Sequence, residues 1–263
     1  MKQRIITGVI AGGGFLAVLF AGGIFFTILV VLLALIGIYE LMKMKHIQPL
    51  SLRGGIGFLF VLLLVLPDAW LEAGLWQVER LELFLLLVIV MLSLTVLTKN
   101  MFTFDEAGFM VLGSVYIGFG FHYFMQARFL DNGLELVFLV LFLVWATDTG
   151  AYFAGRTLGK HKLWPEISPK KTIEGSLGGI VLAFLVGFIY TAFFPVFGSA
   201  LVLTLCVLVV STAGQLGDLV ESAFKRHYAV KDSGQVLPGH GGILDRFDSL
   251  IFVMPILYLF GFL

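Results

Sequence analysis

The chain has 263 residues, of which 59% are hydrophobic and 13% are charged, and its 17 Lys and Arg balance 17 Asp and Glu. A composition this apolar excludes a water-soluble domain with a solvated surface, and apolar runs from end to end leave no room for a separate soluble domain. We therefore expect one all-α integral membrane domain over residues 1–263, built as a polytopic helix bundle.

Apolar segments of spanning length recur along the whole chain. A transmembrane helix needs roughly 20 apolar residues, so the sequence predicts about nine transmembrane helices. They fall near residues 5–21, 24–42, 55–67, 81–98, 108–126, 134–154, 176–194, 199–221 and 247–263. The third run is the shortest, because Pro67 and Asp68 end it. We expect N-terminal spans over 1–130 and the catalytic spans over 131–263.

The basic residues concentrate on one side of the predicted membrane topology. With nine spans and a cytoplasmic N-terminus, the cytoplasmic side holds all of the 17 Lys and Arg except Arg80 and Arg128. Cytoplasmic loops are the ones enriched in Lys and Arg, so this distribution favours a multi-pass protein of the cell membrane with its N-terminus inside. Both long polar loops, 155–175 and 222–246, then face the cytoplasm.

Two carboxylates lie within predicted spans, Asp148 in the sixth and Asp218 in the eighth. Ionisable groups at membrane depth are costly and usually mark a cavity or a pathway. On a helix through the eighth span, Gln215, Asp218, Ser222 and Lys225 recur every three or four residues and form one polar stripe. A stripe that only pairs with a neighbouring helix is the simpler alternative.

Other residues in the spans have structural interpretations. Glu40, near the end of the second span, is expected to reach the membrane interface or to pair with Lys43. The small residues of Gly175–Gly179 indicate close helix packing in lipid. Cys206 lies in an apolar run, cannot form an intrachain disulfide as the one cysteine of the chain, and is expected to be inert.

The first cytoplasmic loop contains Ser168-Pro169-Lys170-Lys171-Thr172 directly before an expected helix start. Ammonium groups and a helix N-terminus both favour phosphate. Lys170 and Lys171 are therefore candidate phosphate ligands. Anchoring of the topology, or contact with anionic lipid headgroups, is the alternative.

The second cytoplasmic loop contains Pro238-Gly239-His240-Gly241-Gly242, whose glycines can bring backbone amides close to an anion. This run matches neither GxxxxGK[ST] nor GxGxxG, so neither standard nucleotide-binding motif is indicated. His240 is expected to form hydrogen bonds rather than to bind a metal.

The residues after this turn suit magnesium and phosphate. Asp245 and Asp248 offer the carboxylate oxygens that magnesium prefers, while Arg246, Lys225 and Arg226 can neutralise phosphate charge. The chain has no CxxC, HExxH or GxSxG motif, which argues against zinc, metalloprotease and serine hydrolase chemistry. The pattern points to phosphoryl or nucleotidyl transfer onto a lipid at the cytoplasmic face.

The residue pattern of the second loop resembles the signature of the phosphatidate cytidylyltransferases, also called CDP-diacylglycerol synthases. The resemblance is carried by Ser222-x2-Lys225-Arg226-x4-Lys231-Asp232-x5-Pro238-Gly239-His240-Gly241-Gly242-x2-Asp245-Arg246-x-Asp248. Asp148-Thr149-Gly150-Ala151-Tyr152 with Gly155-Arg156, and Ser168–Gly175, resemble the same family. The similarity covers about the last 120 residues, and the first half shows only generic spans.

The resemblance implies an enzyme that converts CTP and phosphatidic acid to CDP-diacylglycerol and pyrophosphate in phospholipid biosynthesis, with magnesium required. It assigns metal binding to Asp218, Asp245 and Asp148, with Asp248 as a nearby catalytic carboxylate. The expected catalytic groups further include Lys225, Arg226 and Ser222. The expected phosphate ligands are Lys170, Lys171, Arg246, His240 and Gly241.

The sequence leaves several points open. The alternatives are a CTP-dependent polyprenol or lipid kinase and, from a different class, an ion-coupled transporter that uses Asp148 and Asp218. The expected partners are CTP, phosphatidic acid and the lipid bilayer, with no nucleic acid. Whether a second, monovalent cation completes the site, and whether the chain forms a homo-oligomer, stay open.

Overall fold

The computed structural model describes residues 2–72 and 79–263, which fold into two compact units. The first unit is drawn from the chain up to Met125 together with Ser233–Ile243. The second unit is Gln126–Asp232 together with Leu244–Leu263. Part of the 222–246 loop thus belongs to the first unit, although most of the surrounding sequence belongs to the second. The expectation of one membrane domain divided near residue 130 stays a prediction.

The helices of the first unit come in chain order. They are α1 (Lys2–Ala21), α2 (Gly23–Met44), α3 (Leu52–Val65), α4 (Asp68–Glu72), α5 (Arg80–Leu97) and most of α6 (Phe104–Arg128). The turn between α1 and α2 uses Gly22 and Gly23 at φ of 64° and 54°, a backbone conformation that glycine adopts without steric cost. α2 packs against α1 and α3, and α3 packs against α5.

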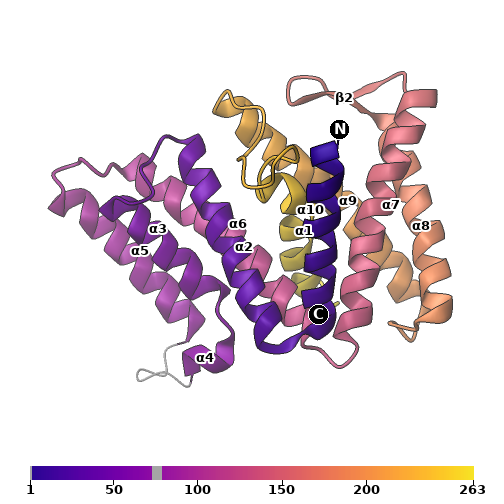
Figure 1. Ribbon diagram of the computed structural model, residues 1–263, viewed down its shortest axis with the longest axis horizontal. Helices are drawn as coiled ribbons and strands as arrows, with labels where there is room; N and C mark the ends of the chain where they lie inside the picture. The colour runs from indigo at the N-terminus through magenta and orange to yellow at the C-terminus, as the bar shows by residue number, and fades with distance from the viewer. Residues whose placement is uncertain (1, 73–78) are drawn as a thin grey trace. The chain divides into compact units, whose positions relative to one another are not determined.

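The second unit contains four helices and a short hairpin. They are α7 (Gly133–Leu158), β1 (Lys162–Trp164), β2 (Ser168–Thr172), α8 (Ile173–Phe193), α9 (Ala200–His227) and α10 (Leu244–Leu259). α7 and α8 pack most closely, α9 contacts both, and α10 packs on α9. Figure 1 shows the hairpin extending beyond one end of α7.

Each of the predicted spans coincides with a helix among the described residues, which confirms a mostly helical protein. Six of these helices are long and apolar enough to cross a membrane: α2, α5, α6, α7, α8 and α9. α3 and the apolar part of α1 are shorter, as is the 16-residue α10. The β1–β2 hairpin is a departure from the expected all-α fold.

α7 and α8 approach each other through glycine, as the sequence predicts. A Cβ added at Gly150 would lie 2.7 Å from the Gly178 carbonyl oxygen, and one at Gly179 would lie 2.6 Å from the Thr147 oxygen. No larger side chain fits between these backbones, so the two helices are in direct contact. Small residues allow this close packing where lipid replaces water around the bundle.

Glu40 departs from the sequence interpretation. It does not extend to an interface, because only 1% of it is exposed, and it accepts hydrogen bonds within the first unit. Its partners are the Ser233 hydroxyl and the Ile243 amide, about 200 positions further along the chain. A buried carboxylate must find such partners, and no local sequence pattern indicates where they lie.

Candidate active site

The β1–β2 hairpin presents the two lysines of the first polar loop. Its strands are antiparallel, with Lys162 opposite Thr172 and Trp164 opposite Ser168. Lys170 and Lys171 therefore lie on β2, directly before α8. The Thr172 hydroxyl accepts a hydrogen bond from the Gly175 amide at 3.1 Å and caps α8, which confirms the predicted helix start.

Glu174, in the first turn of α8, fixes the beginning of the hairpin. Its carboxylate accepts hydrogen bonds from the backbone amides of Lys160 and His161, at 3.1 and 3.2 Å. One of its oxygens also lies 2.6 Å from Nδ1 of His161, whose side chain is 74% exposed. The hairpin is thus held at both ends by the N-terminus of α8.

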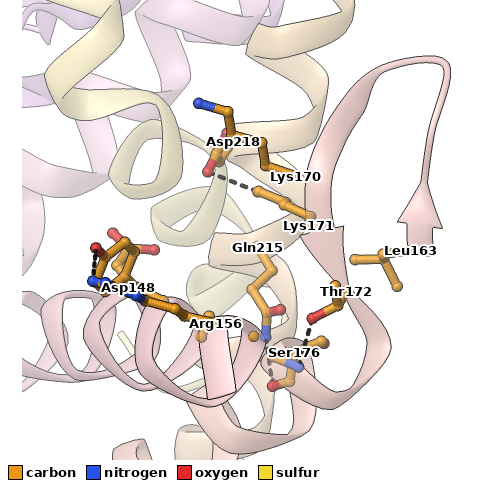
Figure 2. A pocket seen from close by; sticks show the side chains of 13 residues that line it. Asp148, Arg156, Leu163, Lys170, Lys171, Thr172, Ser176, Gln215 and Asp218 are labelled. Carbon is orange, nitrogen blue, oxygen red and sulfur yellow. Dashed lines mark hydrogen bonds and ion pairs between the residues drawn. The ribbon is translucent and has the colours of Figure 1, made fainter. Parts of the chain in front are cut away.

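A cavity of about 390 Å³ opens where the hairpin meets α7, α8 and α9. Its charged lining residues are Asp148, Arg156, Lys170, Lys171 and Asp218. Figure 2 shows Lys170 and Lys171 reaching from the hairpin towards Asp218. Three cations and two carboxylates around one cavity suit a ligand that carries several negative charges.

The contact between Lys171 and Asp218 is the shortest link across this cavity between groups of opposite charge. Nζ of Lys171 lies 2.7 Å from Oδ2 of Asp218, while the Ser222 hydroxyl donates to the other oxygen at 3.2 Å. The two charged side chains are 24% and 34% exposed, so solvent reaches both. An incoming ligand can therefore compete for each of them at modest cost.

Gln215 links α9 to α8 one turn before Asp218. Its amide nitrogen donates to the carbonyl oxygen of Ser211 at 3.1 Å and to that of Ser176 at 3.4 Å, and Figure 2 shows it pointing towards Ser176. The polar stripe predicted on this helix is thus a set of bonded side chains. Gln215 links α8 to α9, and both Gln215 and Asp218 line the cavity.

Asp248 lies near Asp218 because α9 and α10 approach closely at Gly217. A Cβ at Gly217 would lie 2.8 Å from the Asp248 carbonyl oxygen and 2.7 Å from the Phe252 Cβ. The Asp248 carboxyl group interacts electrostatically with those of Asp218 and Asp148. Helices α7, α9 and α10 therefore bring three carboxylates into one neighbourhood, with Lys171 as the cation nearest to Asp218.

These carboxylates do not form a ready-made metal cage. Among the described residues, no group of three or more His, Cys, Asp or Glu side chains is close enough to hold a metal ion. Magnesium usually takes one or two protein carboxylates and completes its shell with water and substrate phosphate oxygens. The chemistry of Asp148, Asp218 and Asp248 fits this type of site.

Asp245 belongs to a second, more buried cluster. Nζ of Lys225 lies 2.8 Å from Oδ1 of Asp245 and also pairs with Glu221 one turn earlier on α9. The side chains of Glu221, Lys225 and Asp245 are 1%, 16% and 7% exposed. Glu221 was not among the predicted site residues, although its spacing of four from Lys225 is a signal for this pair.

The end of α9 is tied to the hairpin. Nε of Arg226 donates to the carbonyl oxygen of Ile167, in the turn between β1 and β2, at 3.2 Å. Arg226 thus contacts backbone here, while its proposed contact with phosphate stays a prediction. Arg246 is exposed in the first turn of α10.

The Pro238–Gly242 turn lies in the first unit. Gly239 and Gly241 adopt φ of 79° and 87°, which confirms the expected use of glycine, and Leu237 pairs with Gly241 through backbone hydrogen bonding. His240 lies beside α1, where a Cβ at Gly8 would be 3.2 Å from its Nε2. The phosphate-binding roles of His240 and Gly241 stay predictions.

The structure therefore sorts the predicted site residues into groups. Asp148, Asp218, Lys170 and Lys171 share the cavity, and Asp248 is close to its carboxylates. Lys225 and Asp245 belong to the buried cluster. Arg156 lines the cavity but was not among the predicted ligands, although it ends the run that resembles the family.

Comparison with known proteins decides the family of the chain. The sequence model of the cytidylyltransferase family matches residues 2–263. The chain belongs to this family. The match extends through the first half, where the sequence alone offers only apolar spans.

Curated relatives of this family member agree with the assignment. A phosphatidate cytidylyltransferase of Bacillus subtilis (strain 168) is 50% identical over 259 residues, which cover 98% of this chain and 96% of the relative. Proteins of the same name from Staphylococcus epidermidis and Staphylococcus aureus (strain COL) are 48% and 45% identical. Each of these alignments covers 98% of this family member and 97% of the relative.

Proposed function

We propose that the chain is a phosphatidate cytidylyltransferase, which transfers CMP from CTP to phosphatidic acid and releases pyrophosphate. The observation that carries this proposal is the cavity lined by Arg156, Lys170 and Lys171 beside the Asp148 and Asp218 carboxylates. Membership of the cytidylyltransferase family and the names of the relatives support it. The product, CDP-diacylglycerol, is an intermediate of phospholipid biosynthesis.

Catalysis of this reaction depends mainly on neutralising phosphate charge and on positioning the two substrates. An oxygen of the phosphatidate phosphate attacks the α-phosphorus of CTP, the bond to the β-phosphate oxygen breaks, and pyrophosphate leaves in line. No general base is needed, since a phosphate monoester is already anionic near pH 7. The protein has to bring two polyanions together and stabilise the charge that moves to pyrophosphate.

The cations of the cavity suit this task. Lys170 and Lys171 on the hairpin and Arg156 on α7 offset the negative charge of the CTP phosphates, with Lys171 exchanging its contact with Asp218 for one with substrate. Arg246, His240 and Gly241 are the further phosphate ligands of this proposal. Ser222 orients Asp218 through the hydrogen bond between them.

Magnesium is part of the proposal. When bound, it would neutralise phosphate oxygens and help to align the attacking and leaving groups. Asp218 and Asp148 would hold it, with Asp245 as the third assigned ligand and Asp248 beside them. Of these, Asp148, Asp218 and Asp248 are near one another in the structure, which supports their part of the assignment. A monovalent cation as a second ion belongs to the same proposal.

The membrane arrangement in this proposal has nine transmembrane helices and a cytoplasmic N-terminus. Six helices of spanning length support a multi-pass protein, and the one-sided distribution of Lys and Arg supports the orientation. The cavity then faces the cytoplasm, so that CTP arrives from water and phosphatidic acid from the bilayer.

The position of a radioactive label in CTP tests the function directly. Purified protein in detergent, given phosphatidic acid, magnesium and α-labelled CTP, should yield labelled CDP-diacylglycerol and unlabelled pyrophosphate. Transfer of label to lipid from γ-labelled CTP alone would instead show a lipid kinase. If neither label appeared in lipid and proteoliposomes containing the protein took up solute, the protein would be a transporter and the proposed enzyme function would be rejected.

A further inference from the structure

Glu40 of α2 is buried against the polar segment that the sequence singles out for function. Its Oε1 accepts the Ile243 amide at 2.9 Å, and its Oε2 accepts the Ser233 hydroxyl at 3.0 Å. These two partners are the first and last residues of the Ser233–Ile243 segment in the first unit. One carboxylate thus binds both ends of an eleven-residue segment and closes it into a loop.

Two glycines of this segment are explained by the same carboxylate. A Cβ at Gly234 would lie 2.7 Å from Cδ of Glu40, and its three nearest atoms all belong to Glu40. A Cβ at Gly242 would collide with the Ser233 hydroxyl that the carboxylate binds and with both carboxylate oxygens. Neither glycine has positive φ, so the backbone conformation would tolerate alanine at both positions. Glycine is required here by the carboxylate, which must come close to the backbone.

The loop closed by Glu40 contains two of the assigned phosphate ligands, His240 and Gly241. It also ends two residues before Asp245 in the chain. The loop consists of bends, turns and an isolated bridge: the His240 amide donates to the Leu237 oxygen, and Leu237 pairs with Gly241. A loop with so little regular structure depends on its anchor for a defined shape.

We propose that Glu40 is a positioning residue of the cytidylyltransferase reaction, which holds the Ser233–Ile243 loop in the shape that binds CTP phosphate. This inference rests on the proposed function. It assigns a part in the reaction to the N-terminal half of the chain, where the sequence shows only apolar spans. Glu40 does not touch the reacting atoms and acts through the loop.

A double-mutant cycle tests the proposal, with CTP, phosphatidic acid and magnesium as substrates in detergent. In Glu40→Ala we expect kcat/KM for CTP to fall about tenfold or more, with a raised KM, because two hydrogen bonds to a buried carboxylate are lost. Glu40→Gln keeps one acceptor oxygen and should lie between wild type and Glu40→Ala. Gly234→Ala should lower kcat/KM about as much as Glu40→Ala does. The double variant should be no less active than Glu40→Ala alone, because both changes disrupt the same contact.

The matched control is Glu106→Gln, which removes an acidic group of the same unit whose partner is Arg53. It should leave kcat/KM within about twofold of wild type. Three results would overturn the proposal. Glu40→Ala could keep full activity, or the losses of the two single variants could add up in the double variant. In the third case, KM would stay constant and kcat would fall only in proportion to the fraction of folded protein.

Hydrogen exchange separates this inference from the proposed function. Peptides covering 233–243 should exchange faster in both Glu40 variants, while peptides from α9 should not change. This comparison needs no turnover, so an inactive wild-type protein would refute the proposed function and still leave the anchoring by Glu40 measurable. Unchanged exchange of the loop in Glu40→Ala would refute the anchoring itself.

Discussion

The two charged clusters along α9 differ in how far solvent reaches them. The Lys171–Asp218 pair borders the cavity with side chains that are 24% and 34% exposed. One to two turns further on, Lys225 contacts Glu221 and Asp245, which are 1% and 7% exposed. The exposed pair can open to receive a ligand at small cost. The buried cluster is costly to break, because little water can reach its charged groups to replace a lost partner.

This contrast suggests a division of labour on one helix. The cavity pair is suited to exchanging partners during a reaction, and the buried cluster is suited to fixing the start of α10 against the end of α9. Asp245 combines the two roles, since it is an assigned metal ligand and also a partner of Lys225 in the buried cluster. Variants of each cluster should separate effects on stability from effects on turnover.

Breaking the buried cluster should have the largest effect. Lys225→Ala leaves the Glu221 and Asp245 carboxylates without their cation, and we expect the free energy of unfolding to fall by about 3–5 kcal/mol. The melting temperature of the purified protein in detergent measures this loss. Lys231→Ala, at an exposed position after the helix, is the control and should change little. An unchanged melting temperature in Lys225→Ala would show that the cluster does not stabilise the fold.

Neutralising the cavity carboxylate should affect turnover instead. Asp218→Asn removes a charge that faces Lys171 and an assigned magnesium ligand, so we expect kcat for CDP-diacylglycerol formation to fall about 10²–10³-fold. Its melting temperature should stay close to that of wild type, because the position is partly solvated. Asp131→Asn, exposed between α6 and α7, serves as the control. Near-normal turnover in Asp218→Asn would remove this residue from the metal assignment.

Removing the cation of the cavity pair should have a smaller effect on the same reaction. Lys171→Ala removes the proposed charge-assisted contact with the CTP phosphates, and we expect kcat/KM for CTP to fall about tenfold. Lys162→Ala on β1 of the same hairpin is the control, since it lies outside the cavity lining. Equal losses in both variants would point to a general electrostatic effect of the hairpin rather than to a contact by Lys171.

Loss of the α8 cap should give the smallest effect. Thr172→Ala removes the acceptor of the Gly175 amide, and we expect a loss of about 1 kcal/mol in the free energy of unfolding. Thr172→Ser keeps the hydroxyl and should retain most of the stability. The two melting temperatures, measured side by side, check this expectation. Equal values for the two variants would show that the hydroxyl does not act as a cap.

The helices and the cavity carboxylates were predictable because their signals are local. Apolar runs located the long helices, and the spacing of Gln215, Asp218 and Ser222 indicated the polar stripe. The close packing of α7 on α8 followed from the small residues of Gly175–Gly179. These features depend on neighbours within one or two helical turns, which the sequence displays directly.

Other features depend on partners that are distant in the sequence. The role of Glu40 could not be predicted, because Ser233 and Ile243 meet it only in the folded chain. Asp245 and Asp248 are one turn apart on α10, and only the packing at Gly217 shows which of them lies near Asp218. The hairpin escaped prediction because β1 has only three residues, too few for a recognisable alternation.

The glycine contact between α7 and α8 limits how the proposed nucleotide site can change. Gly155 and Gly175 line the cavity where these helices meet, and a Cβ at Gly175 would lie 2.8 Å from the Ala151 carbonyl oxygen, so the backbones are too close to accept a side chain at this point of the wall. The opposite wall is the hairpin, which Glu174 and Arg226 hold through hydrogen bonds to its backbone. Variation in the nucleotide that such an enzyme accepts should therefore arise from the length and sequence of the hairpin, while the two helices stay constant.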